Sequence, residues 1–266
     1  MVQIYFPEKN GLFLVPISRP VKDRSPEALA NELAKGPKDS MLLPAFRESE
    51  VPVKVTTQGD AIQVDFQKPP SLSKWPALLD CFMATFQQLH HFHQVEFLVQ
   101  GQRNVVVDGR EFGEESLETY HVNERIDASF FRSNSEEGRI ATVYYVLKGT
   151  PYLVPITQYV SSKTSLEEAI VEAIEERPPF SNLLQSPLPT GSKVLSISRP
   201  ADHKIEMTVN LSGSSLEKRN QEKALLLTYL EIPGIQSVRI REKNGFVFGL
   251  FPKKRPSLIN KEDSRP

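Results

Sequence analysis

A six-residue stretch occurs twice in this chain. Residues 13–18 read FLVPIS, and residues 152–157 read YLVPIT, 139 positions later (152 − 13). The same offset places residues 4–6 (IYF) on residues 143–145 (VYY). Solenoid repeats have periods of roughly 20–50 residues, whereas a period of this length is the size of a whole domain. The sequence therefore predicts two copies of one fold, and a chain of 266 residues is long enough to hold them.

Composition supports folded domains and argues against several classes of function. Hydrophobic residues make up 39% of the chain and aromatic residues 9%, which is enough for a core in each copy. The 32 basic residues balance the 33 acidic ones. This balance argues against nucleic acid as a main partner and gives no polybasic reason to bind anionic lipid.

The single cysteine, Cys81, excludes an intramolecular disulfide. Because it lies in an apolar helical stretch, we expect a buried side chain; a reactive thiol is the alternative, without a local motif to support it. No apolar run approaches the roughly 18 residues that a membrane span requires, and no signal peptide precedes Ile4. This start fits either a cytosolic protein or a chain without its export signal, and the residues leave both open.

The first copy is predicted to have the order β-β-α-β-β-α-β-β. Asn10-Gly11 between two short apolar runs is a hairpin signal, and Pro16 in the second run favours an edge position or a bulge. Ser25 can cap the first helix, which Gly36-Pro37 ends. The predicted strands cover residues 2–6, 11–17, 51–55, 62–66, 95–99 and 104–107.

The second helix of this copy, expected over residues 74–89, has one broad apolar face. We interpret it as a helix that packs in the core. The face consists of Trp75, Leu79, Phe82, Met83, Phe86 and Leu89.

The second copy repeats this order. Ser165 with Glu168, and Ser214 with Glu217, form capping boxes that predict the starts of its two helices. Aligning the two long helices pairs Thr85-Phe86 with Thr228-Tyr229 and makes Leu225 and Tyr229 core counterparts of the first helix. The predicted strands cover residues 140–147, 152–156, 194–198, 205–211, 238–241 and 246–250.

The repeat also predicts where the domains begin and end. We place the first domain at residues 1–110, a linker at 111–137, the second domain at 138–251 and a polar tail at 252–266. Phe130-Phe131 in the linker is expected to pack against a domain, or alternatively to form an exposed docking motif.

The cluster of His90, His91 and His93 is the best candidate for chemistry. In a strand, His91 and His93 would share a face and could bind a metal, but a metal site needs a third ligand and supporting hydrogen bonds. The corresponding residues 231–234 of the second copy contain no histidine. We therefore interpret the cluster as a solvated helix end, where histidine interacts favourably with the helix dipole.

Other candidates are weaker. Residues 108–111 (DGRE) could form an acidic site, but Asp-Gly is ordinary turn chemistry. Residues 253–255 (KKR) are a short basic patch, more typical of a solvated tail than of a recognition element. No phosphate-binding glycine loop, nucleophile elbow or zinc-spaced histidine pair occurs. We predict no catalytic residue, no cofactor and no metal ligand.

The motifs that recur between the copies resemble the GerMN domain. They are residues 14–19 (LVPISR), Gly36-Pro37, residues 64–66 (VDF), Thr85-Phe86 and residues 95–101 (VEFLVQG), with their second-copy partners. The match covers most of the chain except linker and tail. It departs where residues 176–178 (ERP) replace Gly-Pro, and the lipoprotein signal of such proteins is missing. The resemblance implies an α+β fold in which each of two similar domains has a small, mostly antiparallel sheet with two helices on one face, similar to ring-building modules.

The resemblance also implies a role. It points to a non-enzymatic sporulation and germination protein that acts as a scaffold or assembly component of the channel between mother cell and forespore. The full-length form would be an extracytoplasmic lipoprotein, with other channel proteins as partners, weak self-association and no nucleic acid. The alternative is a module that binds cell-wall peptidoglycan or a wall hydrolase. A hydrolase ranks last because it would need a deep cleft with perturbed acid or base residues.

Overall fold

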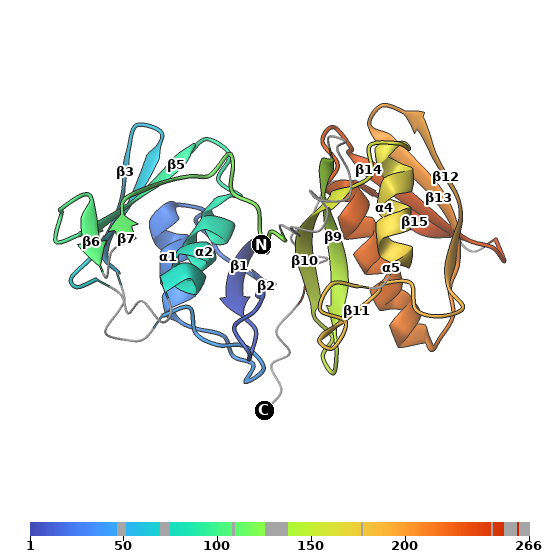
Figure 1. Cartoon of the computed structure of the whole chain (residues 1–266), viewed down its shortest axis with the longest axis horizontal. Helices are drawn as coiled ribbons and strands as arrows, with labels where there is room; N and C mark the ends of the chain where they lie inside the picture. Colours follow the sequence, from blue (N-terminus) through green and yellow to red (C-terminus); the bar gives the residue numbers. More distant parts are fainter. Residues whose placement is uncertain are drawn as a thin grey trace. The chain divides into compact units, whose positions relative to one another are not determined.

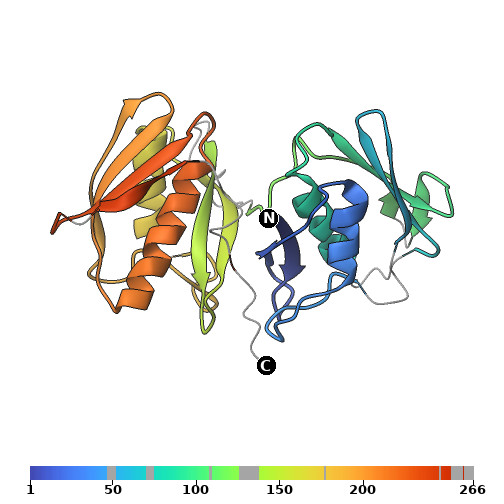
Figure 2. The ribbon, with the colours of Figure 1, turned by 180° about the vertical axis from the view of Figure 1, so that it is seen from behind.

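The computed structural model of the chain describes residues 1–46, 52–69, 75–107, 110–125, 138–176, 178–245, 247–252 and 260. The chain forms two compact units, Met1–Val122 together with Ile259–Pro266, and Asn123–Leu258. Figures 1 and 2 show the elements of both units from the front and from behind.

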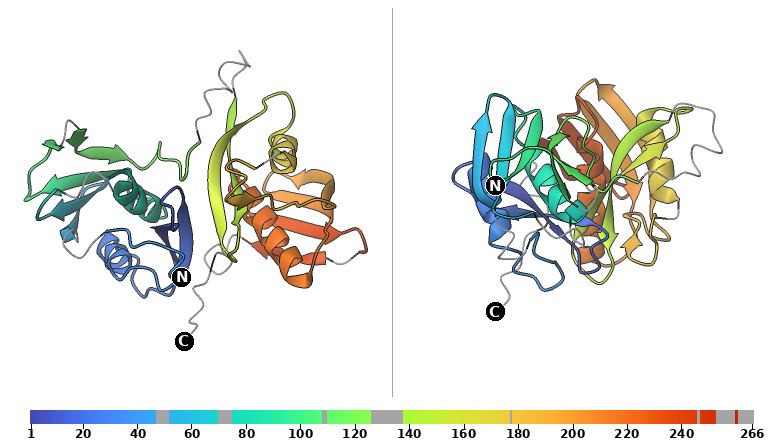
Figure 3. Two further views of the ribbon diagram at one scale, coloured as in Figure 1. Left: turned by 60° about the horizontal axis from the view of Figure 1, so that its bottom comes forward. Right: turned by 60° about the vertical axis from the view of Figure 1, so that its left-hand side comes forward.

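The first unit combines a hairpin with a four-stranded sheet. Strands β1 (Val2–Pro7) and β2 (Leu14–Arg19) pair in antiparallel fashion. The larger sheet has the order β3-β4-β5-β8, with β4 and β5 parallel. Its strands are β3 (Pro52–Gln58), β4 (Ala61–Phe66), β5 (Gln94–Val99) and β8 (Glu114–Ser116), and a small hairpin joins β6 (Val105–Val107) to β7 (Arg110–Phe112). Helices α1 (Pro26–Ala34) and α2 (Trp75–Phe86) lie between the first hairpin and the larger sheet, as the left view of Figure 3 shows.

The second unit repeats this plan. One sheet has the order β10-β9-β11 and the other β12-β13-β14-β15, with β13 and β14 parallel. In Figure 1 both helices of this unit lie between the two sheets. The elements are β9 (Arg139–Leu147), β10 (Leu153–Val160), α4 (Leu166–Glu175), β11 (Leu184–Gln185), β12 (Lys193–Ala201), β13 (Lys204–Asn210), α5 (Ser215–Leu230), β14 (Ser237–Glu242) and β15 (Val247–Pro252).

The α+β class and the two similar domains are confirmed, and the structure refines their layout. In each unit the helices lie between two sheets, where we expected one sheet covered on one face, and the first unit has a further two-stranded sheet of β6 and β7. Residues 110–116, near the predicted start of the linker, contribute β7 and β8 to the first unit. Strand β7 pairs with β6, and β8 pairs with the edge of β5, where the Phe97 N–H donates to the Gly113 carbonyl at 2.9 Å.

Local sequence signals located the helix starts correctly. The Ser25 hydroxyl accepts a hydrogen bond from the Ala28 N–H at 3.3 Å. Both predicted capping boxes, at Ser165 and Ser214, are present. The end of α2 was predicted three residues too late, because the Leu89 N–H bonds to the Phe86 carbonyl and turns the chain out of the helix.

The predicted core faces are confirmed where the structure describes them. Phe82 of α2 is fully buried, with its ring centroid 5.7 Å from that of Phe46 and 6.1 Å from that of Phe97. Leu225 and Tyr229 of α5 are fully buried as well. Met83, Phe86 and Leu89 are also buried, Leu79 is half-buried, and the side chain of Trp75 lies outside the described residues.

The recurring motifs of the sequence are recurring contacts in the structure. The hydroxyl of Thr85 in α2 accepts a hydrogen bond from the Tyr5 N–H at 3.2 Å. In the second unit, the hydroxyl of Thr228 in α5 accepts one from the Tyr144 N–H at 2.9 Å. Each unit therefore ties its long helix to its first strand with the same side chain.

Candidate functional site

The histidine cluster lies in the turn between α2 and β5, with His90, His91 and His93 all exposed. The Nδ1 atom of His93 lies 2.6 Å from the Oε1 atom of Glu118. Within the described residues, no group of three histidine, cysteine, aspartate or glutamate side chains is placed to hold a metal ion. The cluster is thus an exposed turn in which one histidine contacts a glutamate, and that it binds no metal stays a prediction.

Cys81 is fully buried in α2. Burial raises the pKa of its thiol well above the usual value, and the charge of the neighbouring Asp80 adds to the effect. Because the thiolate is the nucleophilic form, this environment disfavours reactivity. The interpretation of Cys81 as a small buried hydrophobe is confirmed.

Three sequence candidates lie outside the described residues. They are Asp108-Gly109, Phe130-Phe131 and the basic patch at residues 253–255. Arg110 and Glu111 belong to β7.

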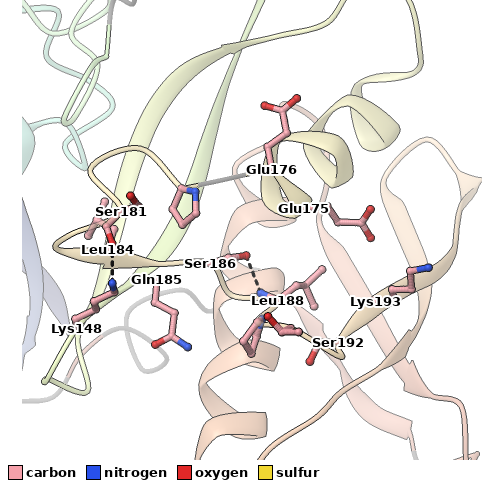
Figure 4. A pocket seen from close by; sticks show the side chains of 13 residues that line it. Lys148, Glu175, Glu176, Ser181, Leu184, Gln185, Ser186, Leu188, Ser192 and Lys193 are labelled. Carbon is pink, nitrogen blue, oxygen red and sulfur yellow. Dashed lines mark hydrogen bonds between the residues drawn. The ribbon is translucent and has the colours of Figure 1, made fainter.

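A pocket of about 680 Å³ opens on the second unit, beside the loop that connects α4 to β12 (Figure 4). Glu175 and Glu176 come from the end of α4, and Lys193 from the start of β12. The Lys148 ammonium group donates to the Ser181 carbonyl at 2.6 Å.

Much of this polar lining is used to hold the loop in place. The Ser186 hydroxyl donates to the Ile174 carbonyl at 2.7 Å and accepts from the Leu188 N–H at 3.0 Å. No aromatic residue is found among the residues described as lining the pocket, so it lacks the stacking surface on which proteins commonly bind sugars. Sequence reasoning missed the pocket because the loop carries no periodic or motif signal.

Two carboxyl groups have an unusually high pKa. Burial, with a smaller contribution from the charge of Glu115, raises the pKa of Asp80 to about 6. Burial and the charge of Glu242 raise the pKa of Glu222 to about 7. Neither residue lines the pocket of Figure 4. Carboxyl groups with a shifted pKa indicate a reaction site when they share a cleft with other reactive groups. Asp80 and Glu222 do not share the pocket of Figure 4 with such groups.

Strand β12 forms an exposed sheet edge. It is nine residues long and none of its residues is buried, and it pairs only with β13 within the described sheet. Leu195 is 48% exposed. The pairing with β13 is interrupted by register shifts, which are a common protection of edge strands against uncontrolled pairing. An edge of this kind offers main-chain N–H and C=O groups to another chain.

The neighbouring helix α4 presents an acidic surface. Four glutamates at its exposed side are Glu168, Glu172, Glu175 and Glu176. Strand β12 carries Lys193 and Arg199, both exposed. The Arg199 guanidinium pairs with the Glu167 carboxylate of α4 at 3.2 Å, so Lys193 is the exposed cation of β12 that faces outward beside the acidic helix.

The outer edges of β2 and β10 each accept the same kind of hydrogen bond from an asparagine, which sequence reasoning missed. The side-chain amide of Asn260 donates to the Pro16 carbonyl at 2.9 Å. The side-chain amide of Asn123 donates to the Pro155 carbonyl at 2.7 Å. Pro16 and Pro155 are equivalent in the repeat. The available signal was a β-branched residue followed by asparagine, at residues 122–123 and 259–260. The edge position expected for Pro16 is confirmed.

Comparisons with known proteins give the relationships of the chain. The model of the family Germane, described as sporulation and spore germination, matches residues 3–105 and 142–245. A solved structure of tandem GerMN domains of the sporulation protein GerM from Bacillus subtilis is similar over 98% of this chain and 99% of that chain, with 17% identity and a TM-score of 0.69. A chain from Clostridium perfringens described as a lipoprotein covers 46% of this chain and 93% of its own, with 16% identity and a TM-score of 0.30, too low to support an argument. No curated protein matches.

Proposed function

The chain belongs to the Germane family of sporulation and spore germination, and from this premise we propose that it is a non-enzymatic scaffold or assembly component of the channel complex between mother cell and forespore. Its fold is that of tandem GerMN domains. The proposal concerns what the two domains do in that setting.

The observation that carries the proposal is the exposed edge strand β12. A strand of nine residues without a buried side chain contributes little to the core of its own unit, and its open edge can pair with another protein. The acidic face of α4 is a complementary surface, since β12 carries the exposed Lys193, whereas Arg199 of β12 already pairs with Glu167 of the same unit. When a helix face of one copy meets a strand edge of the next, the contact is heterologous and builds rings or filaments.

Two further observations support assembly in preference to catalysis. The carboxyl groups of Asp80, Glu115 and Glu222, which have a raised pKa, do not line the pocket. The only cysteine is buried.

We place the protein outside the mother-cell membrane, in the space between the two cells, as a lipoprotein in its full-length form. Its partners would be the other channel proteins of the two membranes, together with weak self-association. Within the described residues, no helix has the length and apolar character of a membrane span.

A charge on β12 tests the proposal. Leu195→Glu places a negative charge on the strand that would meet the acidic face of α4, and we expect at least tenfold weaker association with the purified channel proteins in sedimentation velocity runs. Leu216→Glu is the matched control, because Leu216 is 68% exposed in the first turn of α5. Equal association of both variants and the unmodified chain would contradict a role for this edge.

A further inference from the structure

The equivalent contacts at β2 and β10 make up a repeated binding arrangement. In the first unit the Ser18 N–H donates to the Asn260 carbonyl at 2.9 Å, and the Asn260 amide donates to the Pro16 carbonyl. Asn260 is only 9% exposed. In the second unit the Arg125 N–H donates to the Thr157 carbonyl at 2.8 Å, two residues after Asn123 has bound Pro155. Each proline-containing strand thus accepts a hydrogen bond from the side chain of an asparagine that lies outside its own hairpin.

The proline explains why asparagine suits this edge. Pro16 has no N–H, so at this position the strand presents a carbonyl acceptor alone, and the next outward N–H is that of Ser18. A segment lying along the edge must therefore supply a donor opposite Pro16 and an acceptor opposite Ser18. Asn260 supplies both, the donor from its side-chain amide and the acceptor from its main-chain carbonyl. A residue without a side-chain donor would leave the Pro16 carbonyl without this hydrogen bond.

The order of the segments along the chain gives this arrangement a direction. Asn123 follows the fold of the first unit and is bound by the second unit. Asn260 follows the fold of the second unit and is bound by the first. Each segment is therefore bound by a unit other than the one it follows. Continued beyond one chain, the same rule would place Asn260 on the first unit of another copy.

We propose that the outer edge of β2 is a binding site for an extended, asparagine-bearing segment, and that a second copy of this chain supplies that segment through its own Asn260. Copies then join head to tail, each covering β2 of the next. The inference rests on the proposed assembly role and names the contact between copies. Closure within one chain and exchange between chains use the same hydrogen bonds, so concentration decides between them.

Two complementary full-length variants test the exchange. Ser18→Pro removes the N–H that binds the Asn260 carbonyl and keeps a normal Asn260. Asn260→Ala removes the amide donor and keeps a normal β2 edge. Proline is tolerated on the outer side of an edge strand, and Asn210→Ala, at the exposed end of β13, is the matched control. Circular dichroism verifies that each variant is folded.

The readout is native mass spectrometry of each variant alone and of their equimolar mixture. We expect each variant to remain a monomer of 30.1 kDa, since each lacks one half of the contact. The mixture should form a heterodimer of twice that mass, because one chain supplies the segment and the other the edge. Mixing Ser18→Pro with Asn210→Ala should give less heterodimer, because that control chain closes on itself. A mixture that contains monomers alone would overturn the proposal.

A peptide measurement covers the case in which Ser18→Pro does not fold. A labelled peptide of residues 256–266 should bind the Asn260→Ala chain about tenfold more tightly than the same peptide with alanine at its asparagine position. Equal affinities, or no binding of either peptide, would overturn the proposal. Since neither experiment involves β12, failure here leaves the Leu195→Glu test of the proposed function standing, and the reverse also holds.

Discussion

Thr85 and Thr228 connect distant parts of their units through one hydroxyl each. Both side chains are fully buried, and each accepts the N–H of a tyrosine in the first strand of its unit, at 3.2 and 2.9 Å. The alignment of the two copies paired these threonines. It could not say what they do, because their partners lie 80 and 84 residues earlier in the chain.

Replacing either threonine by valine should destabilise the unit that contains it. Valine has a similar volume but no acceptor, so the N–H of Tyr5 or Tyr144 loses this buried partner, at a cost of about 1–3 kcal/mol. Urea unfolding followed by circular dichroism measures the change. Serine at the same position is the control and should retain most of the stability. A valine variant as stable as the unmodified chain would show that the hydroxyl contributes nothing.

Asp80 should make stability fall as the pH rises from about 4 to about 6. Burial raises its pKa in the folded protein to about 6, against an ordinary value of about 3.9. Between these values the folded state holds a proton that the unfolded state has released, so the free energy of unfolding decreases with pH. The groups facing the carboxyl are Tyr120 and Glu115, with Cys81 beside it.

The substitution Asp80→Asn isolates this effect. It should remove the contribution of Asp80 to the pH dependence between pH 4 and 6 and, at pH 7, stabilise the protein by about 2 kcal/mol, since each unit of pKa shift corresponds to about 1.4 kcal/mol and partial exposure reduces it. The difference in unfolding free energy between variant and unmodified chain, measured at pH 4, 5, 6 and 7, is the readout. A difference that stays constant over this range would contradict the assignment.

At the scale of elements, the two units use different side chains to donate hydrogen bonds to the carbonyl groups at the end of their first helix. In the first unit the Arg19 guanidinium donates to the Glu32 and Gly36 carbonyls, at 2.9 and 2.6 Å, and lies 5.0 Å from the centre of the Phe6 ring. In the second unit the equivalent positions are Gln158 and Tyr145.

There the tyrosine takes over the bond to the helix end. The Tyr145 hydroxyl donates to the Ala173 carbonyl at 3.4 Å and accepts from the Gln158 amide at 3.2 Å.

A double-mutant cycle tests this exchange. Arg19→Gln alone should destabilise the first unit by about 1–3 kcal/mol, because the carbonyls at the end of α1 lose charged donors. Adding Phe6→Tyr, which introduces the hydroxyl of the second unit, should restore about 1 kcal/mol of that loss. Arg24→Gln, at an exposed position, is the control. Effects of the two substitutions that simply add would contradict the coupling.

The elements themselves were largely predictable, and their pairing was not. Hairpin turns, helix caps and apolar periodicity are local signals, so the starts of α1, α4 and α5 could be placed from sequence. How the strands divide into two sheets depends on contacts between distant residues that periodicity does not encode. The strands β7 and β8 were missed because residues 110–116 lack an apolar run and are positioned by pairing with β6 and with the edge of β5.

The candidate surfaces were harder to predict than the fold. The pocket beside α4 is built from a loop without a motif, and the exposure of β12 follows from the sheet order. The asparagine contacts did leave a signal at residues 123 and 260, but its meaning requires the β2 and β10 edges. Apolar and turn residues encode the architecture, whereas polar surface residues carry few constraints that a single sequence reveals.

At the scale of the molecule, duplication doubles every surface. Each unit has its own helices and sheets, so a contact that one unit makes has a counterpart on the other. Such a chain can link neighbours on two sides, which is what a scaffold requires. The surfaces have also diverged: the pair of Gln63 and Glu96 in the first unit corresponds to Glu206 and Arg239 in the second. Different partners for the two units follow naturally from this divergence.

The central claim is that these surfaces serve assembly. Sedimentation velocity across a wide concentration range, on the chain alone and with purified channel proteins of the mother-cell and forespore membranes, tests it most directly. We predict a sedimentation coefficient that rises with concentration, and a larger complex when the channel proteins are added. A chain that remains a 30.1 kDa monomer under all these conditions would contradict the account.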